Sequence, residues 1–305
     1  MSELVNYKIR NYEENDVVKE IEIYNKVIKS FDHKANEYTV ENMDYRYKNE
    51  KFDPQQVKVL IDTKSNEVVG YSAVDFTDSG EARIEYPFIL EEHRTEILMN
   101  KLFKEALSFA KSKSEKVLSD PYRPSSPMAE FLIKNYGASV HDTYKNYVID
   151  VEKLNYDISP AKAYDVTVDK LEKINTFIKN AKKPTGSEIK EEFFKKQFEE
   201  GNYSPNRLKI IKLNEEIVGV IGASIEKTEK EGEAPKSRLN FYIMDLDHPN
   251  ANEFRKVAVG SLYSGLKEEG VKEFITGIGD TSPAKPIFEK LGFTEYDEGF
   301  THYQL

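Results

Sequence analysis

Residues 255–262 read RKVAVGSL, and residues 281–293 read TSPAKPIFEKLGF. The first stretch follows a predicted strand and a polar segment, and we expect it to open a helix. A helix N-terminus exposes unpaired backbone N–H groups and a partial positive charge, so it can hold an anion. Small residues such as Ala258 and Gly260 let a phosphate group come close to the backbone. On these residues alone, a phosphate-binding turn at residues 255–260 and a plain helix, with Gly260 as a close-packing position and Arg255 on the surface, are equally consistent with the sequence.

The segments around this stretch alternate between the periodicity of strands and that of helices. The second stretch ends its helix at Gly292, as glycine often does at a helix C-terminus. A charged segment at 226–236, which contains Gly232, is expected to be a loop. The pattern from residue 171 onward predicts helices at 171–181, 188–200, 254–269 and 283–291, and strands at 208–213, 217–225, 239–246, 274–278 and around Tyr303.

The first half of the chain repeats this order of elements. Its pattern predicts strands at 5–12, 57–61, 68–76, 82–90, 116–119 and 144–151, and helices at 13–30, 94–113 and 126–136. Three short matches align the halves: Val68-Val69-Gly70 with Ile217-Val218-Gly219, Arg94 with Arg255 at the start of a helix, and Ala129 and Gly137 with Ala284 and Gly292. We therefore predict an internal duplication, with domains at 1–152 and 161–305.

The composition narrows the class of protein. The chain has 305 residues, a formal net charge of −10 and no cysteine, and its five histidines are scattered. These features exclude disulfides and thiolate sites, and they argue against a metal centre and against nucleic acid as the main partner. We see no apolar run long enough to span a bilayer and no signal peptide, so we expect a cytoplasmic protein without a membrane partner. Oligomeric state cannot be read from the sequence.

On these residues and motifs, the sequence resembles the GNAT superfamily of N-acyltransferases. The cofactor loop of that family is Q/R-x-x-G-x-G/A, and its late helix has alanine before a Tyr-x-x-x-Gly-Phe ending. The resemblance implies an α/β fold of two GNAT-like domains, each a mixed, largely antiparallel sheet flanked by helices. It also implies that acetyl-CoA or another acyl-CoA is bound, with Thr281 and Ala284 near the pantetheine arm. The pyrophosphate would lie on the loop that fits R-x-x-A-x-G, made of Arg255, Lys256, Val257, Ala258, Val259 and Gly260.

The first half departs further from the family pattern. Its corresponding loop reads Arg94-Thr95-Glu96-Ile97-Leu98-Met99, in which Ile97 and Met99 replace both small residues. Their side chains would crowd a pyrophosphate, and Glu96 would add negative charge beside it. We therefore expect the first domain to be a degenerate copy, and the second to carry the more intact CoA-binding loop.

The residues for proton transfer are less clear from the sequence. Many family members have a tyrosine four residues before the glycine of Gly-Phe, which protonates the departing thiolate, but Phe288 and Ile133 stand at those positions. The family often uses a carboxylate near the central strand as general base. Asp245 and Asp247 are the candidates in the second half, and Glu85 lies on the matching strand of the first. Backbone N–H groups of the third strand are expected to polarise the thioester.

These features support three hypotheses for function. The first is an acyl-CoA-dependent N-acyltransferase that transfers an acyl group, expected to be acetyl, to a primary amine of a small molecule or peptide. The second is a catalytically inactive tandem protein that senses an acyl-CoA or binds a partner protein, because the tyrosine is missing and the first loop is altered. The third is an aminoacyl transferase that uses charged tRNA, against which the net charge of −10 argues.

Overall fold

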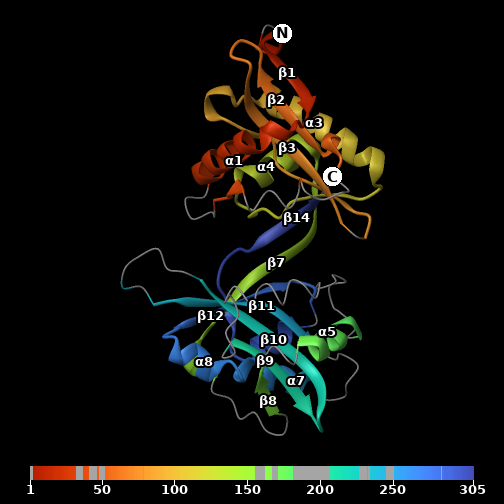
Figure 1. The fold of residues 1–305 in the computed structure, drawn as a ribbon. Coiled ribbons are helices and arrows are strands. Elements are labelled where there is room, and N and C mark those ends of the chain that lie inside the picture. The colour runs from red at the N-terminus through yellow and green to blue at the C-terminus, as the bar shows by residue number, and fades with distance from the viewer. Residues whose placement is uncertain are drawn as a thin grey trace. The chain divides into compact units, whose positions relative to one another are not determined.

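The chain forms two compact units of α/β structure (Figure 1). The computed structural model describes residues 3–31, 37–40, 47, 52–77, 79–154, 162–166, 171–180, 207–226, 232, 234–244, 251–282 and 284–305. The first unit comprises Met1–Thr143 and Phe300–Leu305, and the second comprises Tyr144–Gly299. The helix predicted at 188–200 and most of the loop predicted at 226–236 lie outside the described residues. No helix in the described part is long and apolar enough to cross a membrane.

The first unit is a mixed, largely antiparallel sheet with helices on both faces. Its strands are β1 (Tyr7–Asn11), β2 (Val57–Asp62), β3 (Glu67–Phe76), β4 (Ala82–Ile84), β5 (Phe88–Ile89), β6 (Val117–Ser119) and β14 (Phe300–Gln304). The α-helices are α1 (Val17–Phe31), α3 (Glu96–Lys113) and α4 (Pro127–Tyr136), and short 3-10 turns lie at Glu3–Asn6, Glu14–Asp16, Pro54–Gln56 and Glu91–His93. The strand predicted at 82–90 is thus interrupted between Ile84 and Phe88.

Local sequence explains where these helices begin and end. The Thr95 hydroxyl accepts the N–H of Leu98 over 3.3 Å, so α3 starts one residue after Thr95. Ser126 caps α4 in the same way through the N–H of Ala129, at 3.2 Å. Gly137 ends α4 with φ of 62°, a left-handed conformation that glycine adopts without steric cost.

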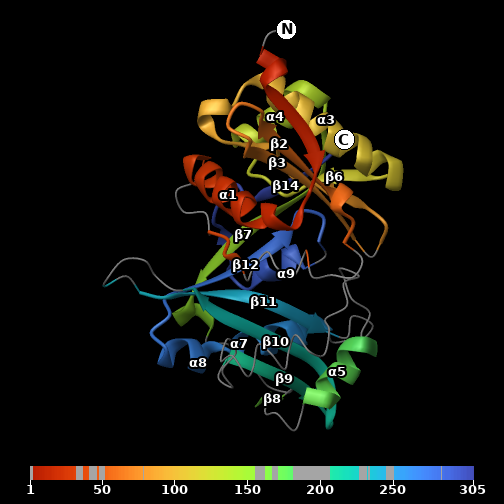
Figure 2. The same ribbon diagram turned by 45° about the horizontal axis from the view of Figure 1, so that its top comes forward.

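Helices α1 and α3 cover opposite faces of the first sheet. Phe88 of β5 packs against Tyr24 of α1, with ring centroids 5.2 Å apart. The next residue, Ile89, points to the other face because consecutive side chains of a strand alternate. There it belongs to one buried apolar cluster with Leu98 of α3. Figure 2 shows α1 and α3 beside strands β2 and β3.

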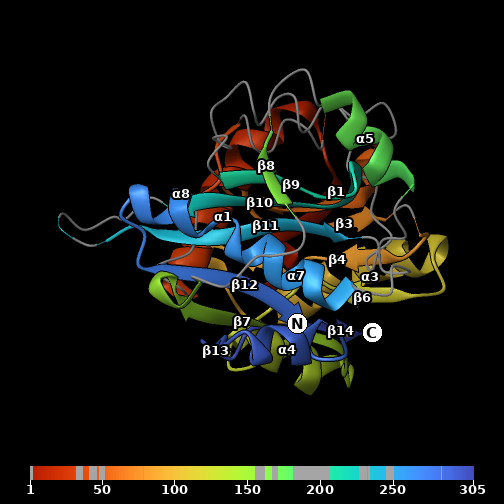
Figure 3. The same cartoon turned by 90° about the horizontal axis from the view of Figure 1, so that it is seen from below.

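The second unit repeats this architecture. Its strands are the end of β7 (Ser139–Asp150), then β8 (Lys162–Asp165), β9 (Leu208–Leu213), β10 (Glu216–Glu226), β11 (Lys236–Met244), β12 (Glu273–Gly279) and β13 (Thr294–Glu295). Its helices are α5 (Leu171–Asn180), α7 (Ala251–Gly260), α8 (Tyr263–Glu268) and α9 (Lys285–Lys290), with a 3-10 turn at Val151–Leu154. The structure has two helices, α7 and α8, where the sequence predicted a single helix at 254–269. Figure 3 shows both near β11.

The two faces of the second sheet are covered in the same way as those of the first. Ile243 of β11 shares an apolar cluster with Ile174 of α5. Its neighbour Tyr242 points to the other face and packs against a second cluster, which contains Phe254 and Val257 of α7. Helix α5 therefore takes the place of α1, and α7 with α8 takes the place of α3.

Backbone details also repeat between the units. The pairing of β2 with β3 shifts by one residue at Val69, directly before Gly70. The pairing of β9 with β10 shifts at Val218, directly before Gly219. A β-bulge at the same place in both sheets is a feature that a shared ancestral unit explains, since such bulges are conserved within families.

An ion pair occupies equivalent positions in the two units with its charges exchanged. Glu81 and Lys116 pair in the first unit, each two residues before the strand partners Arg83 and Leu118. In the second unit, Lys236 and Glu273 lie two residues before the equivalent partners and pair at 2.7 Å. The lysine therefore lies next to β6 in the first unit and on β11, the counterpart of β4, in the second, and the ion pair is present in both units.

The last strand of each half pairs with strands of the other half. β7, which follows α4, continues into the second unit and pairs antiparallel with β12, from Tyr144 with Gly279 to Asp150 with Glu273. β14, which follows α9, pairs with β6 of the first unit at Gln304 and Leu118. The compact units therefore differ from the expected domains 1–152 and 161–305: the first includes the last six residues of the chain, and the second begins at Tyr144.

Candidate functional site

Two parallel strands separate in the middle of the first unit. β4 and β6 pair over three positions, ending with Ile84 and Ser119. The N–H of Asp120 still donates to the carbonyl of Ile84 over 3.0 Å. After this point the two strands part. Within the described residues, the segment that follows β4 forms β5, which pairs with β3 and no longer with β6. Strands that separate leave backbone N–H and C=O groups free to bind an amide-bearing ligand along their facing edges.

In the first unit, the side chain of Tyr122 fills this separation. Its hydroxyl oxygen accepts the backbone N–H of Tyr86 over 2.7 Å. Tyr122 is 8% exposed, and burial raises the pKa of its phenol, helped by the nearby carboxylates of Asp120 and Glu85. The Tyr86 amide is thus already bonded to a protein group and is not available to a ligand.

The loop before α3 is also occupied by packing contacts of the first unit. The Arg94 side chain donates from Nε to the carbonyl of Ile89 over 3.0 Å and lies 5.0 Å from the Phe31 ring centroid. Met99 turns inward, and its sulfur accepts a long contact of 3.9 Å from the Tyr86 hydroxyl. Ile97 is 53% exposed, so a bulky apolar side chain stands beside the first turn of α3. That this loop cannot hold a pyrophosphate in the family's manner stays a prediction.

The equivalent separation in the second unit lacks the blocking side chain. β11 and β12 pair over three positions, ending with Arg238 and Ile275, and then each continues with its outer neighbour only among the described residues. Since Arg238 and Ile275 correspond to Arg83 and Leu118, the position of Tyr122 corresponds to Gly279. Tyr122 faces Thr301 across an isolated bridge, and Gly279 faces Tyr144 in the same way. The second unit therefore has no side chain at the position from which Tyr122 bridges the separation in the first unit.

The phenol of Tyr242 lies beside Phe288, the residue that stands where the family has a tyrosine. The rings of Tyr242 and Phe288 meet edge to face, with centroids 6.0 Å apart. The Tyr242 hydroxyl oxygen is enclosed and has no hydrogen-bond partner among the described residues. Burial raises the pKa of this phenol, and the positive charge of Arg255 acts in the opposite direction. Phe288 itself is 3% exposed and packs on Phe293 at 5.1 Å, so it belongs to the core.

The structure corrects the expected role of the Arg255 segment as the start of a helix. α7 begins at Ala251, so Arg255 is its fifth residue and Gly260 its last. Arg255, Val257, Ala258, Val259 and Gly260 are buried, and Lys256 is exposed. Backbone N–H groups this far into a helix are bonded to carbonyls one turn earlier and cannot hold a phosphate. The match of Arg255 with Arg94 is therefore wrong, because α3 begins only two residues after Arg94.

Other predicted site residues fall at the end of β12 or outside the described part. Thr281 is exposed in the turn after Gly279, and Ala284 immediately precedes α9. Both lie within five residues of Gly279, beside the separation of the second unit. Asp245 and Asp247, the predicted general bases, lie outside the described residues, as does the turn between β11 and α7. Glu85 is 8% exposed and lies next to Tyr86 in the first unit.

Solved structures share this fold over the whole chain. A GCN5-related N-acetyltransferase from Sphaerobacter thermophilus has a TM-score of 0.63 and 11% identity, covering 98% of this chain and 95% of its own. A tandem GNAT protein from the clavulanic acid biosynthesis pathway has a TM-score of 0.59 and 14% identity, covering 98% of both chains. Saccharomyces cerevisiae N-myristoyltransferase, solved with bound myristoyl-CoA, has a TM-score of 0.54 and 14% identity, covering 99% of this chain and 79% of its own.

The chain therefore has the tandem GNAT fold, as the sequence motifs predicted. No protein-family model matches the sequence, and no curated protein matches it. At 9–14% identity, the shared fold does not transfer a substrate from those structures to this chain.

Tyr122, Gly279 and Tyr242 were not predicted from the sequence. No motif contains them, and their roles depend on strand register and on the point where two strands part. The one available signal was the alignment of the halves: counting from the paired strands would have placed Tyr122 opposite Gly279. The described residues contain no group of histidine and carboxylate side chains arranged to hold a metal ion.

Proposed function

We propose that this protein is an acyl-CoA-dependent N-acyltransferase whose acyl-CoA lies in the second unit, between β11 and β12. One observation carries the proposal: Gly279 leaves open the separation that Tyr122 closes in the first unit. Pantetheine is a linear chain with two amide groups, so it suits a slot lined by unpaired backbone N–H and C=O groups. Thr281 and Ala284 would line its far end.

The pyrophosphate position follows from the true start of α7. We place the pyrophosphate at the first turn of α7, which begins at Ala251, because the first N–H groups of a helix have no partner within the helix. In place of a direct phosphate contact, we assign to Arg255 an electrostatic role beside Tyr242, since its charge acts on that phenol. Lys256 is exposed and would add positive potential near the anion.

Transfer joins the acceptor nitrogen to the thioester carbonyl carbon and breaks the C–S bond, and the leaving thiolate needs a proton. We propose Tyr242 as the donor, because its hydroxyl has no other acceptor among the described residues and lies beside Phe288. The nitrogen must lose a proton to a base, for which Asp245 and Asp247 stay the predicted residues. The acceptor is expected to be a primary amine of a small molecule or peptide, and acetyl the transferred group.

Calorimetry with acetyl-CoA and thiol release against an amine panel test the proposal together. Gly279→Tyr should abolish acetyl-CoA binding by closing the slot, whereas Gly279→Ala should bind within about threefold of the parent. Gly279 is the last residue of β12 and pairs with Tyr144, an extended backbone position that residues other than glycine also adopt. An unchanged affinity in Gly279→Tyr would contradict the placement in the second unit.

A non-catalytic acyl-CoA sensor is the second candidate, and the burial of Phe288 at the expected tyrosine position favours it. Thiol release decides between the two. If Tyr242→Phe lowers turnover about 10-fold or more without changing acetyl-CoA affinity, the enzyme hypothesis holds with Tyr242 as acid. Tyr263→Phe is the matched control, because the exposed Tyr263 hydroxyl bonds to Glu152 and lies outside the slot. Binding without any thiol release favours the sensor.

A further inference from the structure

A basic pocket lies in the first unit, along β1 and away from the separated strands. Its volume is about 360 Å³, and it is lined by Tyr7, Lys8, Ile9, Arg10, Asn11, Lys58, Lys101 and Glu105. Four of these eight residues are cationic and one is acidic. A positive pocket in a chain with a formal net charge of −10 is a local reversal of the overall charge.

Lys58 forms the buried part of this pocket. It is 9% exposed, and its ammonium donates to the Asn11 side-chain oxygen over 2.7 Å. The ammonium also lies 5.2 Å from the Phe109 ring centroid. Both partners are neutral, and burial lowers the pKa of Lys58, opposed by the carboxylates of Glu105 and Asp53. A buried cation without a paired anion is costly, and an anion in the pocket would reduce that cost.

The remaining charges of the pocket do not cancel. Lys8, Lys58 and Lys101 form no ion pair within the described part of the chain, and Glu105 is the one carboxylate among the lining residues of this pocket. Arg10 is already engaged, since its guanidinium pairs with Asp16 through bonds of 2.5 and 2.8 Å. Lys101 and Glu105 are one turn apart on α3, which places both beside the pocket.

The free edge of β1 adds backbone donors to this pocket. β1 is the edge strand and pairs with β2 only. The N–H of Tyr12 and the carbonyl of Asn6 bond toward β2, so the alternating residue Ile9 turns its N–H outward. A five-residue edge that carries Lys8 and Arg10 is a poor template for a further strand, because charged edge residues oppose strand addition. A small ligand suits it better than a peptide strand.

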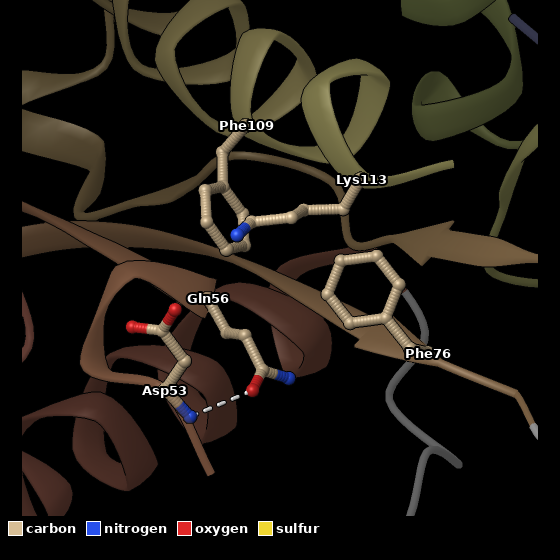
Figure 4. A pocket seen from close by; sticks show the side chains of 5 residues that line it. All are labelled: Asp53, Gln56, Phe76, Phe109 and Lys113. Atoms are coloured by element: carbon tan, nitrogen blue, oxygen red, sulfur yellow. Dashed lines mark hydrogen bonds between the residues drawn. The ribbon is translucent and has the colours of Figure 1, made fainter. Parts of the chain in front are cut away.

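A neighbouring pocket offers a contrast on the same helix. Figure 4 shows Lys113 reaching across the Phe109 ring, 5.9 Å from its centroid, with Asp53 on the facing segment. This pocket, of about 310 Å³, is lined by one cation and one carboxylate together with Gln56, Phe76 and Phe109. Its charges balance, so it has no surplus that would attract an anion.

We propose that the basic pocket binds a small multivalent oxyanion, whose oxygens pair with the ammonium groups of Lys58 and Lys101. Phosphate esters and polycarboxylates share this chemistry, and their affinities distinguish them. The inference is independent of the proposed acyl transfer, because none of the lining residues belongs to the slot between β11 and β12.

Calorimetry on the full chain at low salt, with pyrophosphate and with citrate as separate probes, tests this site. We expect Lys58→Gln and Lys101→Gln each to weaken the preferred probe about 10-fold, as loss of one charge-assisted contact does. Glu105→Gln should tighten binding, because it removes the opposing carboxylate. Lys113→Gln is the matched control on the same helix and should leave affinity unchanged.

Two results would overturn the proposal. One is the absence of binding heat for both probes at about 10 mM. The other is an equal affinity in Lys101→Gln and Lys113→Gln, which would show that the ions bind without using this pocket. Lys101 is a partly exposed residue of α3, so its variant keeps the test decisive even if Lys58→Gln does not fold.

Discussion

The backbone amide of Tyr86 donates to the hydroxyl oxygen of Tyr122, 2.7 Å away, across the gap between two parting strands. The same gap in the second unit ends at Gly279, which has no side chain to reach across it. One duplicated framework therefore carries one separation that a side chain bridges and another with glycine at the equivalent position. The two units therefore differ at this position, where the first has a tyrosine and the second a glycine.

Removing the Tyr122 hydroxyl should destabilise the first unit. Tyr122→Phe leaves the buried N–H of Tyr86 without its acceptor, which costs about 1–3 kcal/mol of unfolding free energy. Urea denaturation followed by circular dichroism measures the loss. Tyr136→Phe is the control, because the Tyr136 hydroxyl makes a longer bond of 3.3 Å to Asn100 at a partly buried site. Equal losses in the two variants would contradict the bridging role of Tyr122.

Gly299 should tolerate no side chain. A Cβ atom there would lie 2.1 Å from the Tyr144 carbonyl oxygen and 2.6 Å from the Lys145 Cα, and its φ is 70°. We expect Gly299→Ala to cost more than about 3 kcal/mol, because backbone atoms cannot move aside and the conformation is strained as well.

Gly80→Ala separates the two causes of the Gly299 effect. Gly80 has a similar φ of 82°, but a Cβ there would meet no atom within 4 Å. It should cost only about 1 kcal/mol, from backbone strain alone. The midpoints of urea unfolding compare the two variants, and a Gly80→Ala loss as large as that of Gly299→Ala would refute the steric argument.

The exchanged ion pair can be reversed by mutation. Glu273→Lys places two ammonium groups together in the second unit and should cost about 0.5–1 kcal/mol. The double variant Lys236→Glu/Glu273→Lys reproduces the polarity of Glu81 and Lys116 in the first unit, so it should recover most of that loss. A double-mutant cycle on unfolding free energy measures the coupling. Additive losses would show that the contact is not energetically coupled.

The Glu22 carboxyl on α1 should stay ionised well into acid. Lys19 and Lys26 each bond to it at 2.8 Å and lower its pKa to about 2. Because the folded pKa lies below the unfolded one, this contribution is present near neutral pH and is lost as the pH falls toward 2. Glu22 is largely exposed, so the effect on stability should stay below about 0.5 kcal/mol.

Carbon-detected NMR titration of the Glu22 carboxyl measures this pKa directly. Lys26→Gln should raise it toward the ordinary value, since one of the two paired ammonium groups is removed. Lys64→Gln, in the exposed turn between β2 and β3, should leave it unchanged. A titration midpoint near the ordinary value in the parent protein would contradict the paired geometry.

Periodicity and caps predicted most of the described helices and strands. Asn66 and Asn214 mark the two hairpin turns with φ of 59° and 47°, and Gly137 and Gly292 end the late helices with positive φ. These are local signals, because a single residue type makes the conformation accessible. The duplication was predicted from short residue matches, and at one of them, Gly70 with Gly219, each glycine directly follows a β-bulge in the structure.

Features that depend on strand pairing could not be predicted in this way. The start of α7 lies four residues before Arg255, and the match to the loop pattern put it too late, although Asn250, a residue type common at helix N-caps, precedes Ala251 in the sequence. The break between β4 and β5 appears only where β3 pairs with each in turn. Tyr242 carries no motif, and its place beside Phe288 depends on which face of β11 turns toward α7 and α9. Hydrophobic patterns report burial, but they do not report which buried groups meet.

The pairing of β14 with β6 has a consequence for how the protein is made. Tyr303 is 2% exposed in the first unit, its N–H bonds to the Ser119 hydroxyl, and the N–H of Leu305 bonds to the Val117 carbonyl. A ribosome synthesises β14 after the whole second unit, so the first half emerges early, but its sheet is completed only after β14 has been made. We expect a nascent chain stalled before Phe300 to leave its N-terminal portion sensitive to protease, and a chain that includes β14 to be protected.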